Sequence, residues 1–348
     1  MLAYIFKRLL LMVPTLFGIL LVSFVIIQFV PGGPVEQLVQ ELRGSGLAGE
    51  VSSSAGLYRG AQGVDADRIK EIRELYGFDK PAVERFIDMI VRYARFDLGH
   101  SYFHHKGVWE LILEKLPVSI SLGLWSFLLV YSVSIPLGIA KAVRDGSRFD
   151  VLTSTAILAG YAIPGFVLGV AMLVLFGGGS FLQWFPLRGL TSDNWSELSL
   201  IGKAIDYFWH LFMPLSCLVV GSFAVTTMLT KNTFLEEVRR QYVMTARAKG
   251  LSERRVFYRH VFRNALIPVV TGFPAAFIGS FFAGSLLIET LFSLDGLGLL
   301  SYEAVIKRDY PVVMGSLYVF SLLGLITKLV TDVLYTWVDP RVKFGAGS

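Results

Sequence analysis

The chain has 348 residues, of which 54% are hydrophobic and only 17% are charged, and its mean hydropathy is +0.59. Soluble domains carry about 25% charged residues, so this composition argues against an ordinary soluble protein and indicates a membrane protein. The formal charge of +5 is compatible with nucleic acid or an anionic surface as partner, and the single cysteine, Cys217, excludes an intrachain disulfide and a cysteine-rich metal site.

Six apolar stretches are long enough to cross a bilayer as helices, which takes about 20 residues for a hydrocarbon core of roughly 30 Å. In chain order they are 9–30, 118–140, 151–176, 208–230, 267–292 and 312–338. Five of them contain a proline, where we expect kinks: Pro14, Pro136, Pro164, Pro214 and Pro274. The sequence therefore predicts an all-α integral membrane protein with six transmembrane helices.

Basic residues predict the orientation of these helices, because cytoplasmic loops carry an excess of Lys and Arg. With the N-terminus inside, the inner segments 1–8, 141–150, 231–264 and 339–348 hold 2, 3, 9 and 2 basic residues. The long outer segment 31–117 holds 11 basic and 13 acidic residues. We therefore expect both termini to be cytoplasmic. The first stretch is too long for a signal peptide and lacks a small-residue cleavage site, so we expect it to be retained.

The outer segment 31–117 is the one extramembrane region of domain size. Its Gly- and Ser-rich part, 44–63, indicates a loop, and DADRIKEIRELYGF (65–78) predicts a short helix. A second helix is predicted in PAVERFIDMIVRYARF (81–96). Its expected apolar face consists of Val83, Phe86, Ile87 and Ile90. We expect this region to lean on the membrane helices and to face a periplasmic partner or substrate; a purely structural cap is the alternative.

Catalytic signatures are missing from the sequence. It contains no HExxH, no GxSxG and no phosphate-binding GxxxxGK[ST], which argues against common hydrolases and against ATP binding by a P-loop. Glu289, Lys328 and Asp332 lie in apolar stretches, where charges are functional candidates by default. Lys328 and Asp332 are four residues apart, so we expect them to pair rather than to relay protons. Adjacent His104 and His105 point in different directions, which argues against a shared metal ion.

The most basic inner segment, 231–264, is predicted to be a helix, a glycine turn and a second helix. The run FLEEVRRQYVMTARAKG favours helix up to Gly250, a natural C-terminal cap. Ser252 is placed to cap the next helix, with Glu253 in its first turn. The orientation rule alone demands a basic inner loop. A short loop tethered at both ends argues against helix-turn-helix binding of nucleic acid.

Small residues mark the turn of this loop. Ala246, Ala248 and Gly250 leave a low corner that another protein can approach closely, among basic residues that suit acidic groups. The runs YVMTARAKGLS and RHVFRNALIP resemble the cytoplasmic coupling loop of binding-protein-dependent ABC importer permeases, in the dipeptide/oligopeptide (DppB/OppB-like) branch. The wider permease pattern begins Glu-Ala-Ala, whereas this chain has Met244, Thr245 and Ala246, so no role of that glutamate carries over.

The resemblance extends from end to end. It includes VPGGPV after the first stretch, RFDLGHSY before the second, RDYPVVMG at the start of the sixth and DVLYTWVDPRV near the C-terminus. Within the branch, VSIPLGIAKAVRDGSRFD, GYAIP, FPLRGL, TMLTKN and FSLDGLGLL are most similar to the Yej-type permeases. That subgroup is associated with uptake of peptides and peptide antibiotics of the microcin C kind.

The resemblance implies a type I ABC importer permease fold, alternating access and a set of partners. These are a second homologous permease, a cytoplasmic ABC ATPase, a periplasmic peptide-binding protein, a peptide substrate and the bacterial inner membrane. The chain itself is then no enzyme and has no cofactor, because ATP and Mg bind to the ATPase. Docking of the ATPase is implied for Thr245, Ala246, Arg247, Ala248, Lys249, Gly250, Leu251 and Ser252.

The substrate path is expected among prolines and small or polar residues of the spans. Candidates are Ser134, Pro136, Tyr161, Pro164 and Gly165. Close helix packing by small residues explains the same pattern equally well.

The organisation expected from the sequence has four parts. They are 1–30 (cytoplasmic tip and first helix), 31–117 (periplasmic segment), 118–338 (permease core with the coupling loop) and 339–348 (cytoplasmic tail). Alternatives to a peptide permease are an importer for another substrate such as nickel or a glycoside, a membrane scaffold, and a membrane-embedded enzyme. An enzyme would be active alone, a scaffold would bind partners without transport, and a permease would depend on an ATPase and a binding protein.

Overall fold

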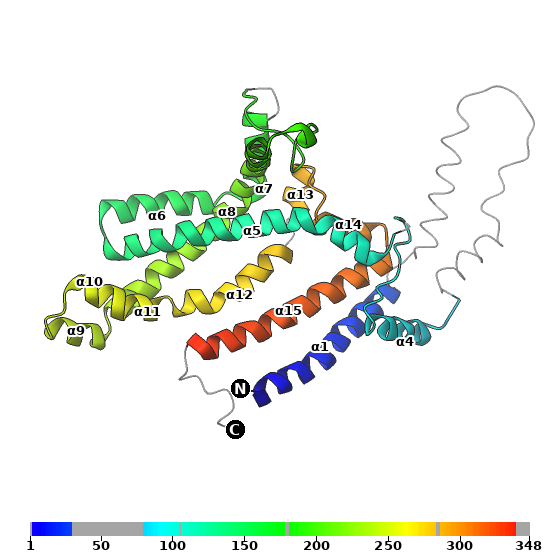
Figure 1. Cartoon of the computed structure of the whole chain (residues 1–348), viewed down its shortest axis with the longest axis horizontal. Coiled ribbons are helices and arrows are strands. Elements are labelled where there is room, and N and C mark those ends of the chain that lie inside the picture. The colour runs from blue at the N-terminus through cyan, green and yellow to red at the C-terminus, as the bar shows by residue number, and fades with distance from the viewer. Residues whose placement is uncertain (1, 30–78, 105, 178–180, 283–285, 339–348) are drawn as a thin grey trace, which may run out of the picture. The chain divides into compact units, whose positions relative to one another are not determined.

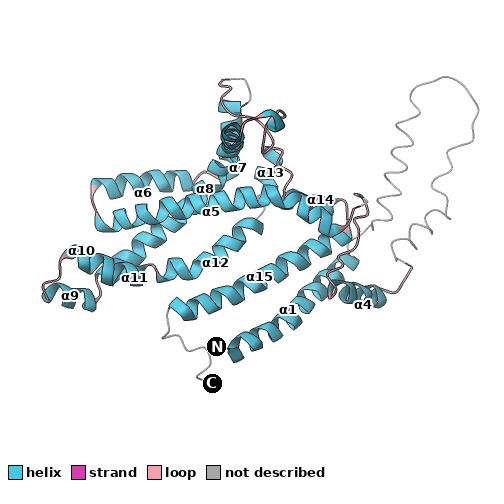
Figure 2. Cartoon of the chain, in the orientation of Figure 1, coloured by secondary structure: helices cyan, strands magenta, loops and turns pink. Residues whose placement is uncertain are grey.

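A computed structural model describes residues 2–29, 79–104, 106–177, 181–282 and 286–338, and the elements in these ranges are helices (Figures 1 and 2). The helical fold predicted from the sequence is therefore confirmed. The chain forms two compact units. One comprises Met1–Arg8, Lys115–Leu299 and Leu323–Ser348, and the other comprises Leu9–Glu114 and Leu300–Leu322. The predicted helix at 65–78 and the loop at 44–63 lie outside the described residues.

Four helices are each long and apolar enough to cross a membrane: α1 (Leu2–Phe29), α5 (Val108–Val143), α8 (Leu200–Val238) and α15 (Tyr310–Val338). Two further stretches are bent pairs. α6 (Arg148–Tyr161) meets α7 (Gly165–Met172) at 86°, and the helices from Glu253 to Ala265 meet α12 (Ile267–Phe282) at 44°. If each bent pair is one span, the described residues hold six, in agreement with the six predicted stretches.

The third predicted stretch, 151–176, is not one helix. α6 ends at Tyr161, and Pro164 is the N-cap of α7 with a ψ of 134°, which is outside the helical range. A residue that precedes proline is disfavoured in the α region, so Ile163 favours a break at this point. The other four prolines of the predicted stretches lie inside α1, α5, α8 and α12 without ending them.

The fifth predicted stretch, 267–292, is also divided. It contains α12 and the short helix α13 (Leu286–Leu291), and residues 283–285 between them lie outside the described residues. Before α12, the chain forms α10 (Glu253–Val256), a π-helical segment (Phe257–Val261) and α11 (Phe262–Ala265). The bend falls where Pro268 follows at the start of α12, since proline cannot donate a helical hydrogen bond.

In the unit that contains Leu9–Glu114, α4 (Ala82–Tyr93) confirms the second predicted outer helix. Phe86 packs against α1, with its ring centroid 5.6 Å from Phe17 and 5.1 Å from Phe24. The predicted apolar face is partly wrong, because Val83 and Ile87 are 69% and 55% exposed. The helix instead buries the rings at positions 86 and 93, one of which is the tyrosine that ends it.

Two sequence motifs far apart in the chain meet in this same unit. Asp309 of RDYPVVMG is 2% exposed and accepts hydrogen bonds from the hydroxyl of Ser101 and, at 3.1 Å, from the amide of Tyr102 in RFDLGHSY. A Cβ at Gly315 would come within 2.7 Å of the Val108 side chain. These contacts therefore hold the start of α5 and the segment before it against the start of α15.

In the other unit, the charged residues of the apolar stretches have specific neighbours. Asp332 pairs with Arg8 of α1 at 2.9 Å and accepts a hydrogen bond from the hydroxyl of Tyr4 at 3.0 Å, so the predicted pairing with Lys328 is wrong. Glu289 of α13 is 1% exposed and accepts a hydrogen bond from the Leu299 amide at 2.7 Å. Asp332 therefore joins α15 to α1, and Glu289 joins α13 to the segment around Leu299.

Candidate functional site

The first part of the site is a short helix, α9 (Gln241–Ala248), that follows directly on α8. A break at Arg239 and Arg240 separates the two helices, and Arg240 pairs with Glu236 at 2.7 Å. The hydroxyl of Tyr242 donates to the carboxylate of Glu237 at 2.5 Å. Side chains on both sides of the break therefore fix α9 to the end of α8.

The turn after α9 has the geometry expected from the sequence. Gly250 has a φ of +78°, a left-handed conformation that favours glycine, and no described atom lies within 4 Å of the place of a Cβ. Ser252 occupies the N-cap of α10 as predicted, although its side chain makes no capping hydrogen bond within the described loop. The guanidinium of Arg247 donates to both carboxylate oxygens of Glu253, at 2.8 and 3.0 Å, and this pair closes the turn.

A small hydrophobic core supports this turn from inside. Its buried members are Ala142, Phe234, Val243, Ala246, Val256, Val261 and Ala265. Phe234 belongs to α8 and Ala142 to α5, so the turn shares one core with the ends of two long helices. We call α9 and the turn up to Ser252 the coupling element (residues 241–252).

The predicted docking residues differ in exposure. Ala246 is 6% exposed because it faces the core of the coupling element, and Leu251 is partly buried. The exposed members are Thr245, Arg247, Ala248, Lys249, Gly250 and Ser252. Of the three small residues that were expected to let a partner approach closely, Ala248 and Gly250 are exposed and Ala246 is buried.

The second part of the site is a cavity of about 700 Å³ between α5, the α6–α7 bend, α8, α12 and α13. Of the five path residues proposed from the sequence, Tyr161, Pro164 and Gly165 line it. Ser134 is buried and donates to the carbonyl of Phe223 at 3.3 Å, and Pro136 is exposed; neither lines the cavity. The structure therefore brings three of the five together.

The described residues that line the cavity carry no charged side chain. Its hydroxyl groups come from Ser126, Tyr131, Tyr161, Ser222, Thr226 and Ser280, and aromatic faces come from Phe127 and Phe166. Such a lining offers donors and acceptors together with apolar surface, but no fixed charge. It suits a polar, flexible ligand recognised through hydrogen bonds rather than through ion pairs.

Small residues create the space for this cavity. A Cβ at Gly165 would lie 2.7 Å from the carbonyl oxygen of Cys217, so glycine lets the start of α7 approach the backbone of α8. Cys217 itself is 4% exposed, as expected for a small core residue. The α6–α7 bend therefore rests directly on α8.

Most lining residues of the cavity were not predicted from the sequence, although they follow a helical pattern. On α5 the lining residues are Ser126, Phe127, Val130 and Tyr131, and on α8 they are Cys217, Leu218, Gly221, Ser222, Val225 and Thr226. Both sets recur at helical spacing, which places each on one helix face. Only the structure shows that the two faces are opposed.

Residues 134–344, which include the coupling element and most of the cavity, match the family described as "Binding-protein-dependent transport system inner membrane component". The chain belongs to this family. Its membership confirms the resemblance inferred from the motifs around Gly250.

This family member is similar to several permeases over nearly its whole length. It is 55% identical to the "Peptidoglycan transport system permease protein YejB" of Agrobacterium fabrum, with 98% of each chain covered. It is 52% identical to the "Inner membrane ABC transporter permease protein YejB" of Escherichia coli O157:H7, with 98% of this chain and 99% of that chain covered. It is 34% identical to the "Di/tripeptide transport system permease protein DppB" of Pseudomonas aeruginosa, with 99% of both covered. The chain is thus an ABC transport permease that crosses the inner membrane several times.

Proposed function

We propose that this permease imports short peptides and peptide antibiotics, with energy from a separate ATPase that docks on the coupling element. The turn at Gly250 supports this proposal, because it is exposed and rests on a hydrophobic core that it shares with the ends of α5 and α8. The similarity to permeases named for dipeptides, tripeptides and peptidoglycan supports the peptide class.

Docking of an ATPase is supported by shape and charge. The turn presents Ala248 and Gly250 without bulky side chains, and Lys249 beside them is exposed. On the following helix, Arg254, Arg255 and Arg259 are exposed around an open hollow of about 600 Å³. A basic surface of this kind is complementary to acidic groups on a partner protein.

The remaining partners follow from the family description and from the proposed orientation. A system that depends on a binding protein needs an external subunit that delivers substrate, and the outer segment that contains α4 is our candidate for its contact. With both termini cytoplasmic, the coupling element lies on the cytoplasmic side, where ATP is available. A second homologous permease completes the translocation path in this proposal.

The neutral cavity supports a substrate recognised by its backbone. Peptide amides present the same donors and acceptors whatever the side chains, so hydroxyl groups can bind many sequences. Aromatic faces can also pack on sugar rings, so a glycoside or a sugar-linked peptide would use the same lining. Uptake assays with free peptides, sugar-linked peptides and simple glycosides would separate these classes.

The docking assignment is tested at Gly250. Gly250→Trp places a large ring at the exposed turn, and we expect a complex that inserts but loses at least about tenfold in ATP-driven uptake. Gly250→Asn is the matched control, because asparagine tolerates the left-handed conformation with a small side chain. We expect Gly250→Asn to retain most uptake.

The measurements are uptake into liposomes and retention of the ATPase during purification of the complex. Normal uptake by Gly250→Trp would refute docking at this turn. Equal loss in both variants would assign the effect to backbone strain instead of blocked approach.

A further inference from the structure

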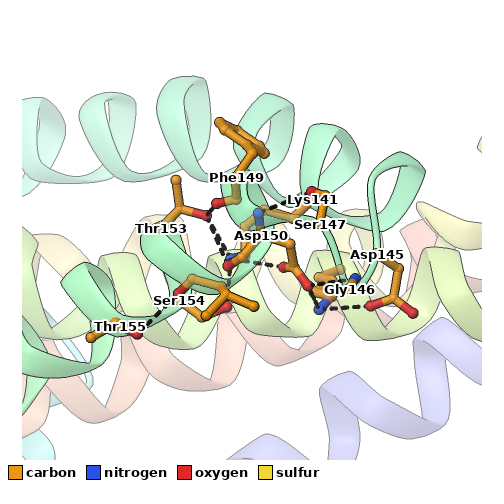
Figure 3. Close-up of polar contacts among 11 residues, drawn as sticks. Lys141, Asp145, Gly146, Ser147, Phe149, Asp150, Thr153, Ser154 and Thr155 are labelled. Carbon is orange, nitrogen blue, oxygen red and sulfur yellow. Dashed lines mark hydrogen bonds and ion pairs between the residues drawn. The ribbon is translucent and has the colours of Figure 1, made fainter.

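A buried ion cluster lies at the end of α5 and was not apparent from the sequence. Lys141 is 0% exposed, and its ammonium group is 3.1 Å from the carboxylate of Asp150 at the start of α6 (Figure 3). The same ammonium donates to the hydroxyls of Thr153 and Ser154, at 2.8 and 2.6 Å, and to the carbonyl of Asp150 at 2.9 Å. These polar contacts of Lys141 therefore join α5 to the first turns of α6.

The cluster continues to a third helix. Lys231 of α8 donates to the other carboxylate oxygen of Asp150 at 2.7 Å and pairs with Asp145 at 3.0 Å. Asp150 also accepts a hydrogen bond from the amide of Gly146 at 3.1 Å. Two lysines thus face two aspartates, and the cluster ties α5, α6 and α8 together at one point.

The position of the cluster relates it to the coupling element. Lys231 lies less than one turn before Phe234, which is 0% exposed in the core beneath α9. Ala142, next to Lys141, belongs to that core as well. The cluster and the coupling element therefore share the same ends of α5 and α8.

The opposite end of α6 reaches the cavity. α6 packs along α8, where a Cβ at Gly160 would lie 3.3 Å from Val220, and its last residue, Tyr161, lines the cavity. The 14 residues of α6 span about 20 Å as a helix. α6 is consequently a lever, with its start held in the cluster and its end in the cavity wall.

Stability alone is a poor explanation for such a cluster. Desolvation of buried ions offsets much of their attraction, and apolar replacements of similar volume are often as stable. Buried ions can instead favour one arrangement of the helices that hold them, because an alternative packing leaves a charge unpaired. A cluster that bridges three helices therefore fixes the position of α6 relative to α8.

We propose that Lys141, Asp150 and Lys231 are positioning residues that clamp α6 to α8, so that displacement of the coupling element is transmitted to the cavity wall at Tyr161. The inference rests on the proposed function, in which an ATPase moves the coupling element. It adds the route by which that movement reaches the substrate.

The clamp is tested first by a distance measurement between two spin labels, which requires no substrate. Spin labels at Met244 on α9 and Leu158 on α6, which are 63% and 51% exposed, report on both ends of the lever. The labels are introduced as cysteines in a Cys217→Ala chain, within the complex of permeases and ATPase. We expect the same distance without nucleotide and in the ATP-bound complex. A shift of about 2 Å or more in this chain would overturn the clamp, whatever the substrate is.

A second experiment removes the ion pair between Lys231 of α8 and Asp150 of α6. Lys231→Met removes one of the two lysines that face Asp150 but keeps its ion pair with Lys141, so neither of these buried charges is left unpaired. We expect ATP hydrolysis to continue, peptide uptake per ATP to fall about tenfold and the label distance to change on ATP binding. Lys203→Met, the same substitution near the start of α8, is the control and should behave like the unsubstituted chain.

The outcomes separate this inference from the proposed function. A constant distance and unchanged uptake per ATP in Lys231→Met would overturn the clamp while leaving peptide import standing. A lack of peptide uptake by the unsubstituted complex would refute the proposed substrate. The label distances would still decide whether α6 moves with α9.

Discussion

At the scale of single residues, the cavity depends on close approach of backbones. Gly165 lies at the start of α7, where a Cβ would come within 2.7 Å of the Cys217 carbonyl oxygen. A backbone atom cannot move aside as a flexible side chain can. The size of this one residue therefore sets the separation between the α6–α7 bend and α8.

Gly165→Ala should push α7 away from α8. We expect a loss of about 1–3 kcal/mol in stability, typical of an overpacked site, together with weaker peptide uptake. Gly272→Ala in α12 is the control, because nothing lies within 4 Å of its Cβ position. Thermal unfolding of the purified complex and uptake by liposomes measure the two effects. Equal behaviour of the two variants would contradict the packing argument.

At the scale of elements, one tyrosine of α9 forms hydrogen bonds with both neighbouring helical segments, in addition to the hydrophobic core beneath α9. The hydroxyl of Tyr242 donates to Glu237 and accepts from the side-chain amide of Asn264 at 3.1 Å. Burial, and then the hydrogen bond to Glu237, raises the pKa of Tyr242 above its ordinary value of 10.0. The protonated phenol is therefore the form that docks α9.

This attachment should depend on pH in a defined direction. Because folding raises the pKa of Tyr242, its contribution is complete below about pH 10 and is lost as the pH rises through the higher folded value. A spin label at Met244 should keep constant mobility up to about pH 10 and gain mobility above it.

Tyr242→Phe removes the hydroxyl while keeping the ring. We expect α9 to be less stably attached by about 1 kcal/mol at neutral pH, and the step in label mobility above pH 10 to disappear. The same pH profile in both chains would show that Tyr242 does not hold α9.

At the scale of the whole molecule, local patterns in the sequence predicted local structure. The apolar lengths predicted the long helices, and Gly250 predicted the turn after α9, because a left-handed residue there favours glycine. A kink was predicted at Pro164, but the complete break between α6 and α7 was not, because proline is often tolerated inside membrane helices. Whether a proline ends a helix depends on the neighbours that replace its lost hydrogen bond.

Long-range contacts account for most of what the sequence could not predict. Lys231 lies 81 residues from Asp150, so no spacing rule connects them. Asp332 was expected to pair with a lysine one turn away, but Arg8, more than 300 residues distant, is its partner. The cavity likewise combines faces of helices whose opposition depends on the fold.

In the function proposed above, this permease couples ATP hydrolysis in a partner to the passage of peptides. The most direct test is ATP hydrolysis and uptake by the complete complex in liposomes, with and without binding protein and a short peptide. We predict that peptide and binding protein together stimulate hydrolysis and that peptide accumulates only with ATP. If hydrolysis did not respond to any peptide, or if no ATPase were associated with the permease, the coupling of ATP hydrolysis to peptide transport would be refuted.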